Sequence, residues 1–135
     1  MLTYVFDTNV IVSGLMSNEG ASFRLLELFL DKRFNLALSL PLYREYWEVT
    51  EREKLNVDKD VREVVLKYFA KHCDRTEIHF KWRPFLKDEN DNMVLETAVS
   101  ANADIVTHNV KDFVGVEKKF NVRVLKPQEV INECS

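Results

Sequence analysis

The stretch VFDTNVIV, residues 5–12, places the acid Asp7 between two apolar segments near the start of the chain. Residues 2–6 (LTYVF) predict a short buried strand and residues 10–16 a helix, so Asp7 falls in the turn between them. Aspartate disfavours strands, and an ionised carboxylate is costly in a protein core unless it is paired or binds a cation. Asp7 is therefore expected to have a structural partner or a chemical role at the end of the first strand.

The rest of the chain alternates between strand and helix patterns. Strands are predicted at residues 34–39, 76–80, 103–108 and 120–125, and helices at 20–33, 40–53, 58–72, 91–102 and 127–134. The third of these helices is expected to bury one apolar stripe, made of Val61, Val64, Val65, Tyr68, Phe69 and His72. This alternation predicts an α/β fold with a mostly parallel sheet covered on both faces, in which sites form beyond the carboxyl ends of the strands.

Length and composition limit the classes of protein to consider. A chain of 135 residues predicts one domain over residues 1–135. The net charge of −3, from 22 acidic and 19 basic residues, argues against binding nucleic acid over the whole surface but permits a local site. No apolar run approaches the roughly 20 residues of a membrane span and no signal-like segment opens the chain, so we expect a cytoplasmic protein without a membrane anchor. Cys73 and Cys134 are isolated and are expected to be reduced thiols.

Two further acids fall on apolar helix faces. Glu45 shares a face with Leu42 and Tyr46, whereas Arg52 is assigned to the opposite face of the same helix. Asp91 begins the apolar stripe of the helix over residues 91–102. Each acid also has a purely structural interpretation: a helix cap for Asp91, an ion pair for Glu45, and a turn or cap for the acid after the first strand.

All three acids are expected at the same edge of the parallel sheet. Carboxylates gathered there repel one another unless a cation neutralises them or some stay protonated, and hard oxygen ligands suit Mg²⁺ or Mn²⁺. Two such ions about 3.5–4 Å apart activate a water and stabilise the leaving oxygen in phosphodiester hydrolysis. The chain has no Walker-type loop, GxGxxG, GxSxG or paired-histidine motif that would favour a different chemistry.

Three segments, in this order and spacing, resemble the motifs of the PIN domain. They are VFDTNVIVSGL (5–15), LSLPLYREYWEV (38–49) and KDENDNMVLETAVSANADIVTHNVKDF (87–113). PIN domains are a metal-dependent ribonuclease family that includes the toxins of many toxin–antitoxin pairs. The resemblance implies a three-layer α/β/α sandwich around a mostly parallel sheet, with Mg²⁺- or Mn²⁺-dependent RNA cleavage at an acidic pocket.

The resemblance also implies roles for individual residues. Asp7 matches the first acid of the family, Glu45 the second and Asp91 the third. Asn9 matches the polar residue that helps to hold the first carboxylate, and Thr107 matches the hydroxyl residue at the end of the fourth strand.

The fourth acid of the family pattern is missing. Its position holds Asn109, and the nearest acid downstream is Asp112. Either Asp112 completes the site or a second metal binds weakly; we expect one firm metal position and a second that fills mainly when substrate phosphate is present. Asp88 is a further acid, which either serves through a water or is a solvated loop residue.

A basic segment precedes the third motif. Lys81, Arg83 and Lys87 alternate there with Trp82 and Phe85, so bases of RNA could stack on the rings while the cations meet phosphates. The alternative is an amphipathic loop that folds its aromatic side chains onto the body of the protein.

Partners and rival functions complete the expectations. A homodimer is expected through helices near the second motif, where Tyr43, Tyr46 and Trp47 would act as aromatic anchors. An antitoxin partner is implied by the resemblance alone. The rivals to an endoribonuclease are a PIN-like interaction module that has lost activity and a phosphohydrolase with an Asp nucleophile, although Asn9 stands where the latter usually has a second Asp.

Overall fold

The computed structural model describes residues 1–52, 55–79 and 85–135. Its strands are β1 (Thr3–Phe6), β2 (Asn35–Leu38), β3 (Asp74–Arg75), β4 (Asp104–Val106) and β5 (Val124–Leu125). Its helices are α1 (Thr8–Met16), α2 (Ala21–Leu30), α3 (Leu40–Thr50), α4 (Lys59–His72), α5 (Glu89–Ala101), the 3₁₀ helix η1 (Val110–Phe113), α6 (Val116–Phe120) and α7 (Pro127–Cys134). Among these described residues, no helix has both the length and the apolar character needed to span a membrane.

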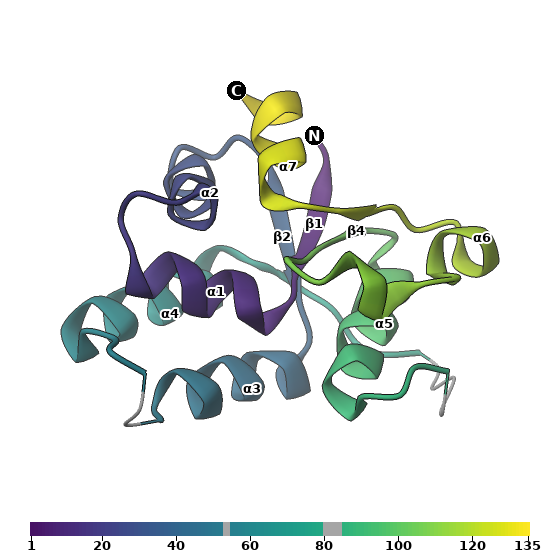
Figure 1. Cartoon of the computed structure of the whole chain (residues 1–135), viewed down its shortest axis with the longest axis horizontal. Helices are drawn as coiled ribbons and strands as arrows, with labels where there is room; N and C mark the ends of the chain where they lie inside the picture. Colours follow the sequence, from purple (N-terminus) through teal and green to yellow (C-terminus); the bar gives the residue numbers. More distant parts are fainter. Residues whose placement is uncertain (53–54, 80–84) are drawn as a thin grey trace.

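The five strands form one sheet in the order β3-β2-β1-β4-β5, and the paired strands run parallel. Strand β1 therefore lies in the middle, between β2 and β4. Helix α5 packs against β1, β2 and β4, whereas α1, α2 and α7 pack together on the other side (Figure 1). This arrangement confirms the predicted α/β fold with helices on both faces of a parallel sheet.

A cluster of aromatic side chains packs against one side of the central strand β1. Tyr4 and Phe6 point to the same side of β1, as residues two apart in a strand do, and both rings lie against Phe34, at centroid distances of 5.3 and 5.8 Å. Phe29 of α2 stacks on Phe34 at 5.8 Å and meets Phe69 of α4 edge to face at 5.4 Å. Since interlocking aromatic rings leave a strand little freedom, β1 is a rigid support for the residues that follow it.

The register of the sheet places the strand ends side by side. Phe6 pairs with Val106 of β4, and the next residue, Asp7, donates its backbone N–H to the Val106 carbonyl at 2.9 Å. Strand β2 on the other side of β1 ends at Leu38, and Ser39 then begins α3. The carboxyl ends of the three central strands thus form one edge, as the parallel arrangement requires.

Three expectations about secondary structure were wrong. The predicted strand at 76–80 is absent over 76–79, and residue 80 lies outside the described residues; the strand is the pair Asp74–Arg75, which joins β2 by backbone pairing without an apolar pattern. In α4, Val61 and Val64 are 49% and 69% exposed and His72 is exposed too, because the face of the helix that is buried centres on Leu66 and Phe69. The short helices η1 and α6 were not predicted, since four or five residues are too few to show a helical period.

Candidate metal centre

Asp7 leaves β1 at the edge of the sheet and caps α1. One carboxylate oxygen accepts the backbone N–H of Thr8 at 2.8 Å, and the other accepts the hydroxyl of Thr107 at 2.8 Å and the side-chain amide of Asn9 at 3.3 Å. The side chain is only 7% exposed. Burial raises the pKa of Asp7, and the hydrogen bonds from Thr107 and Thr8 oppose that shift. The interpretation of Asp7 as a helix cap is thus confirmed, but capping uses only one of its two carboxylate oxygens.

The end of β4 is tied to the start of α1 through Asn9 and Thr107. The Thr107 hydroxyl is fully buried and also accepts the backbone N–H of Asn109 at 3.0 Å. Asn9 reaches the same hydroxyl at 3.4 Å, and its carbonyl oxygen accepts the backbone N–H of His108 at 3.3 Å. The two residues that the resemblance assigned to a supporting role therefore both contact the Asp7 carboxylate.

Glu45 enters the same region from α3 and is 7% exposed. Burial is the main cause that raises its pKa; the charge of Glu48 adds to the shift, and Arg52 opposes it. Within the described part of the chain no ion pair involves Glu45, so the interpretation of this acid as half of a salt bridge finds no support. A buried carboxylate of this kind is unstable in its ionised form until a cation compensates it.

Asp88 caps α5, whereas Asp91, for which capping was the structural alternative, lies in the first turn of the helix. Asp88 is the N-cap of α5, where its carboxylate accepts the backbone N–H of Asn90 at 2.8 Å, so the capping interpretation of Asp91 was wrong. Asp91 lies in the first turn of α5 and is partly buried. Burial, followed by the charges of Asp7, Asp88 and Asp112, raises the pKa of Asp91 to about 7.

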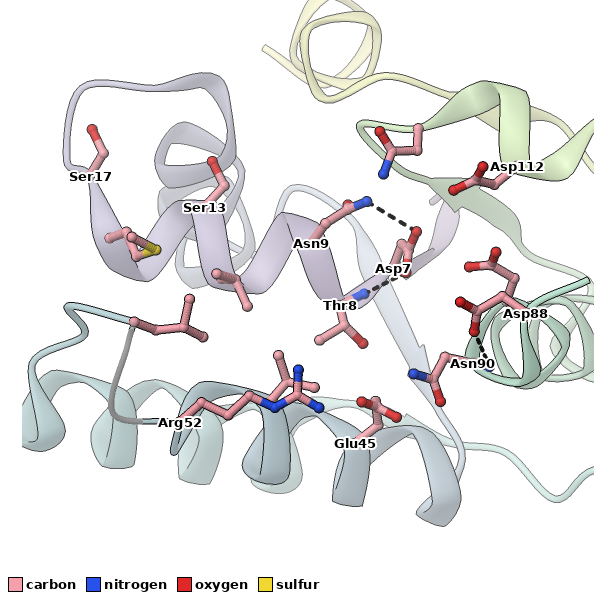
Figure 2. Close-up of a pocket in the computed structure, with 16 residues that line it drawn as sticks. Asp7, Thr8, Asn9, Ser13, Ser17, Glu45, Arg52, Asp88, Asn90 and Asp112 are labelled. Carbon is pink, nitrogen blue, oxygen red and sulfur yellow. Dashed lines mark hydrogen bonds between the residues drawn. The ribbon is translucent and has the colours of Figure 1, made fainter.

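These acids line one cavity of about 630 Å³. Its polar wall includes Asp7, Glu45, Asp88, Asp91, Asn109 and Asp112. Figure 2 shows Asp7 at the start of α1, Glu45 on α3, Asp88 at the start of α5 and Asp112 on η1, with their carboxylates around a common space. We will call this space the acidic cavity. Both candidates for the fourth position, Asn109 and Asp112, reach it.

Several residues of the acidic cavity were missed from the sequence, among them Thr8, Asn90 and Arg52. Thr8 is 9% exposed, and its hydroxyl is the one buried side-chain oxygen or nitrogen in the described residues that has no hydrogen-bond partner. Asn90 and Arg52 also line the acidic cavity. The assignment of Arg52 to the opposite face from Glu45 was wrong, because α3 ends at Thr50 and Arg52, beyond the helix, lines the same cavity as Glu45.

The donor set fits a hard divalent cation by its chemistry. As the side chains stand, no group of three or more His, Cys, Asp or Glu residues in the described ranges is arranged to hold a metal ion. Yet the carboxylates of Asp7, Glu45 and Asp91 all have raised pKa values, and nearby acids contribute to each shift. Carboxylates that disfavour one another's charge gain stability by sharing a cation, and oxygen-only donors select Mg²⁺ or Mn²⁺ over softer metals.

The basic segment predicted to bind RNA is only partly described. Lys81, Trp82 and Arg83 lie outside the described residues. Lys87 is exposed and lines a second cavity, together with Phe85.

One of the three aromatic anchors predicted for a homodimer is buried inside the chain. Tyr46 is 0% exposed and donates its hydroxyl to the carbonyl of Phe6, so its assignment to a surface was wrong. Tyr43 and Trp47 are partly exposed but occupied by α4: the Tyr43 hydroxyl donates to a backbone carbonyl of α4 at 2.7 Å, and the Arg62 guanidinium lies 4.6 Å from the Trp47 ring. These rings hold α3 against α4.

A parallel sheet with an acidic cavity beyond the carboxyl ends of its central strands defines an α/β protein with a candidate site at the usual ligand-binding edge. The family model for the PIN domain matches residues 3–111, and the chain belongs to the PIN domain family. A search of curated proteins found no match.

Solved structures show the same fold. VapBC2 from Rickettsia felis, bound to a DNA fragment from their promoter, matches with 20% identity and a TM-score of 0.57, over 93% of this chain and 98% of that chain. VapBC-1 from nontypeable Haemophilus influenzae matches with 18% identity and a TM-score of 0.57, over 94% and 99%. FitAB bound to an IR36 DNA fragment matches with 20% identity and a TM-score of 0.58, over 92% and 94%.

Proposed function

We propose that this protein is a Mg²⁺- or Mn²⁺-dependent endoribonuclease, formed by a single domain over residues 1–135. The observation that carries the proposal is the convergence of Asp7, Glu45 and Asp91, from three different elements, on one cavity at the carboxyl edge of the sheet. Membership of the PIN domain family supports the same proposed function.

Each acid has a distinct part in the proposed site. Asp7 is held by Thr107, Asn9 and the first turn of α1, so it is the fixed ligand. Glu45 on α3 and Asp91 on α5 would be the further ligands. When bound, the metal supplies a water of lowered pKa as the nucleophile and stabilises charge on the phosphate.

The fourth ligand position distinguishes this chain from the full family pattern. Asn109 and Asp112 both line the acidic cavity, and the charge of Asp112 raises the pKa of both Asp7 and Asp91. We propose that Asp112 supplies the charge that Asn109 lacks. The second metal position is then the weaker one and fills with substrate phosphate present.

A cleavage assay tests the proposal. The purified protein is incubated with an end-labelled mixed RNA pool in Mg²⁺, in Mn²⁺ and in EDTA, and products are resolved on a gel. We expect metal-dependent cleavage that leaves 5′-phosphate ends, lost in Asp7→Asn and Asp91→Asn and retained in Glu19→Gln, which removes a charge from an exposed loop. A folded wild-type protein that cuts no RNA with either metal would overturn the proposal and favour the interaction module.

A protein partner belongs to the same proposal. The similar structures are the VapBC and FitAB complexes, and the PIN domain family includes the toxins of many toxin–antitoxin pairs. We propose that an antitoxin controls this nuclease and that two copies of the chain associate. Size-exclusion chromatography with light scattering checks the second point, with an expected mass of about twice the 15.9 kDa of one chain.

A further inference from the structure

A second cavity, of about 350 Å³, adjoins the acidic cavity. The two share Asp88, Asp91 and Asp112, so they lie next to each other across the start of α5 and the helix η1. The other residues of the second cavity are Phe85, Leu86, Lys87, Lys111 and Val114. We will call it the flanking cavity. Neither the family match nor the acids of the proposed metal centre assign it a ligand.

The wall on the α5 side is firmly anchored. The side chain of Asn92, which is 3% exposed, accepts the backbone N–H of Leu86 and donates to its carbonyl, both at 2.9 Å. The ring of Phe85 meets Phe120 of α6 edge to face at 5.0 Å. Residues 85–87 are thereby fixed beside the first turn of α5, and Lys87 is presented at the cavity from a defined backbone.

The two cavities together have basic side chains on either side of the carboxylates. Arg52 lines the acidic cavity on the α3 side, beside Glu45, as Figure 2 shows. The carboxylates are central, and Lys87 and Lys111 lie beyond them in the flanking cavity, one on each wall. A polyanion cut at the acidic centre would therefore find cations for its neighbouring phosphates on both sides.

The flanking cavity also offers apolar surface. Phe85 is partly exposed at its wall, and Val114 is 75% exposed. The ring of Phe85 and the branched side chain of Val114 can pack against a flat base. The two lysines of the same cavity can then contact the phosphates next to that base. Such a base must be unpaired, because the bases of an A-form duplex are stacked and inaccessible to a side pocket.

We propose that the flanking cavity is a nucleotide subsite, which binds an unpaired base of single-stranded RNA next to the bond that is cut, with Lys87 and Lys111 on the adjacent phosphates. The proposal rests on the proposed nuclease function. It assigns to Phe85, Lys87, Lys111 and Val114 of the flanking cavity a part in holding the substrate that the acids alone do not define.

Binding of a labelled single-stranded RNA of about 12 nucleotides tests the subsite. Fluorescence anisotropy is measured over a series of salt concentrations in Mg²⁺ with the Asp7→Asn protein, which under the proposed function does not cut RNA. We expect each of Lys87→Gln and Lys111→Gln to lower the slope of log Kd against log salt by about 0.7, the value for one phosphate contact on a single strand. Lys71→Gln, which removes an exposed lysine from the last turn of α4, is the matched control and should leave the slope unchanged.

The base-binding part has its own test. Phe85→Leu keeps an apolar side chain against Phe120 but removes the ring, and we expect it to weaken Kd about 5-fold or more at an unchanged salt slope. Val114→Ser, at an exposed position that does not endanger folding, should weaken Kd about 2- to 5-fold by the loss of apolar area. The same RNA annealed to its complement is expected to bind less tightly and to be insensitive to both changes.

The possible failures can be told apart. If the lysine and Phe85 variants bind like their parent while the wild-type protein cleaves RNA, the subsite is wrong and the nuclease proposal stands. Equal binding of duplex and single strand would overturn the unpaired-base assignment. If the Asp7→Asn protein binds no RNA and the wild-type protein cuts none, both proposals fail.

Discussion

Replacing Asp91 by Asn is expected to stabilise the metal-free protein at neutral pH. Burial and the charges of Asp7, Asp88 and Asp112 raise the pKa of Asp91 from 3.8 to about 7, a shift of roughly three pH units. At about 1.4 kcal/mol per unit, the ionised carboxylate destabilises the folded state by at most about 4 kcal/mol. Because Asp91 is only partly buried, solvent screens the repulsion, and we expect a gain of about 1–2 kcal/mol.

The sign of the pH dependence follows from the direction of the shift. Since the pKa of Asp91 is higher in the folded than in the unfolded chain, the folded state binds more protons between about pH 4 and pH 7. Asp91 thus lowers the stability of the wild-type protein as the pH rises through that range. The advantage of Asp91→Asn should be full near pH 7.5 and should largely disappear near pH 4.5.

Urea unfolding in EDTA at these two pH values measures the difference. Glu19→Gln, which removes the same charge from an exposed loop, should change stability little at either pH. Adding Mg²⁺ should stabilise the wild-type protein more than Asp91→Asn, because the variant has lost a ligand. An Asp91→Asn protein that is less stable than wild type at pH 7.5 without metal, or that gains equally at both pH values, would refute the reasoning.

Two further changes probe the walls of the two cavities. Thr8→Val removes a buried hydroxyl that has no partner and should stabilise the metal-free protein by about 1 kcal/mol in urea unfolding; a loss of stability would mean that the hydroxyl is hydrogen-bonded, for instance to water. Asn92→Ala breaks two hydrogen bonds to Leu86 and leaves its backbone groups unpaired, so we expect a loss of about 2–3 kcal/mol and faster hydrogen exchange of the Leu86 amide. An unchanged exchange rate at Leu86 would show that another contact anchors this segment.

The positions of the main acids could be predicted because each follows from a simple geometric rule. Asp7 ends a strand, and the carboxyl ends of parallel strands meet at one edge. Glu45 and Asp91 interrupt apolar faces that repeat with the helical period, so their side chains had to point toward the body. The sequence was therefore sufficient to predict that the three acids lie close together, and they do line one cavity.

Other features depend on tertiary contacts that leave no pattern. Strand β3 has only the exposed residues Asp74 and Arg75 and is defined by backbone pairing with β2. The exposure of Val61 and Val64 depends on which side of α4 meets α3, where Arg62 contacts Trp47, and the apolar spacing does not reveal that side. The unpaired hydroxyl of Thr8 is likewise visible only when all its neighbours are in place.

The hydrogen bond between Thr107 and Asp7 joins residues 100 positions apart in the chain. At a synthesis rate of about 5–20 residues per second, the ribosome needs roughly 5–20 s after making Asp7 to add its partner. The central strand β1 is made well before its neighbour β4 and before the hydroxyl that orients the Asp7 carboxylate. A nascent chain that has not reached residue 107 thus carries the first acid without the group that positions it, which under the proposed function delays nuclease activity until that residue has been made.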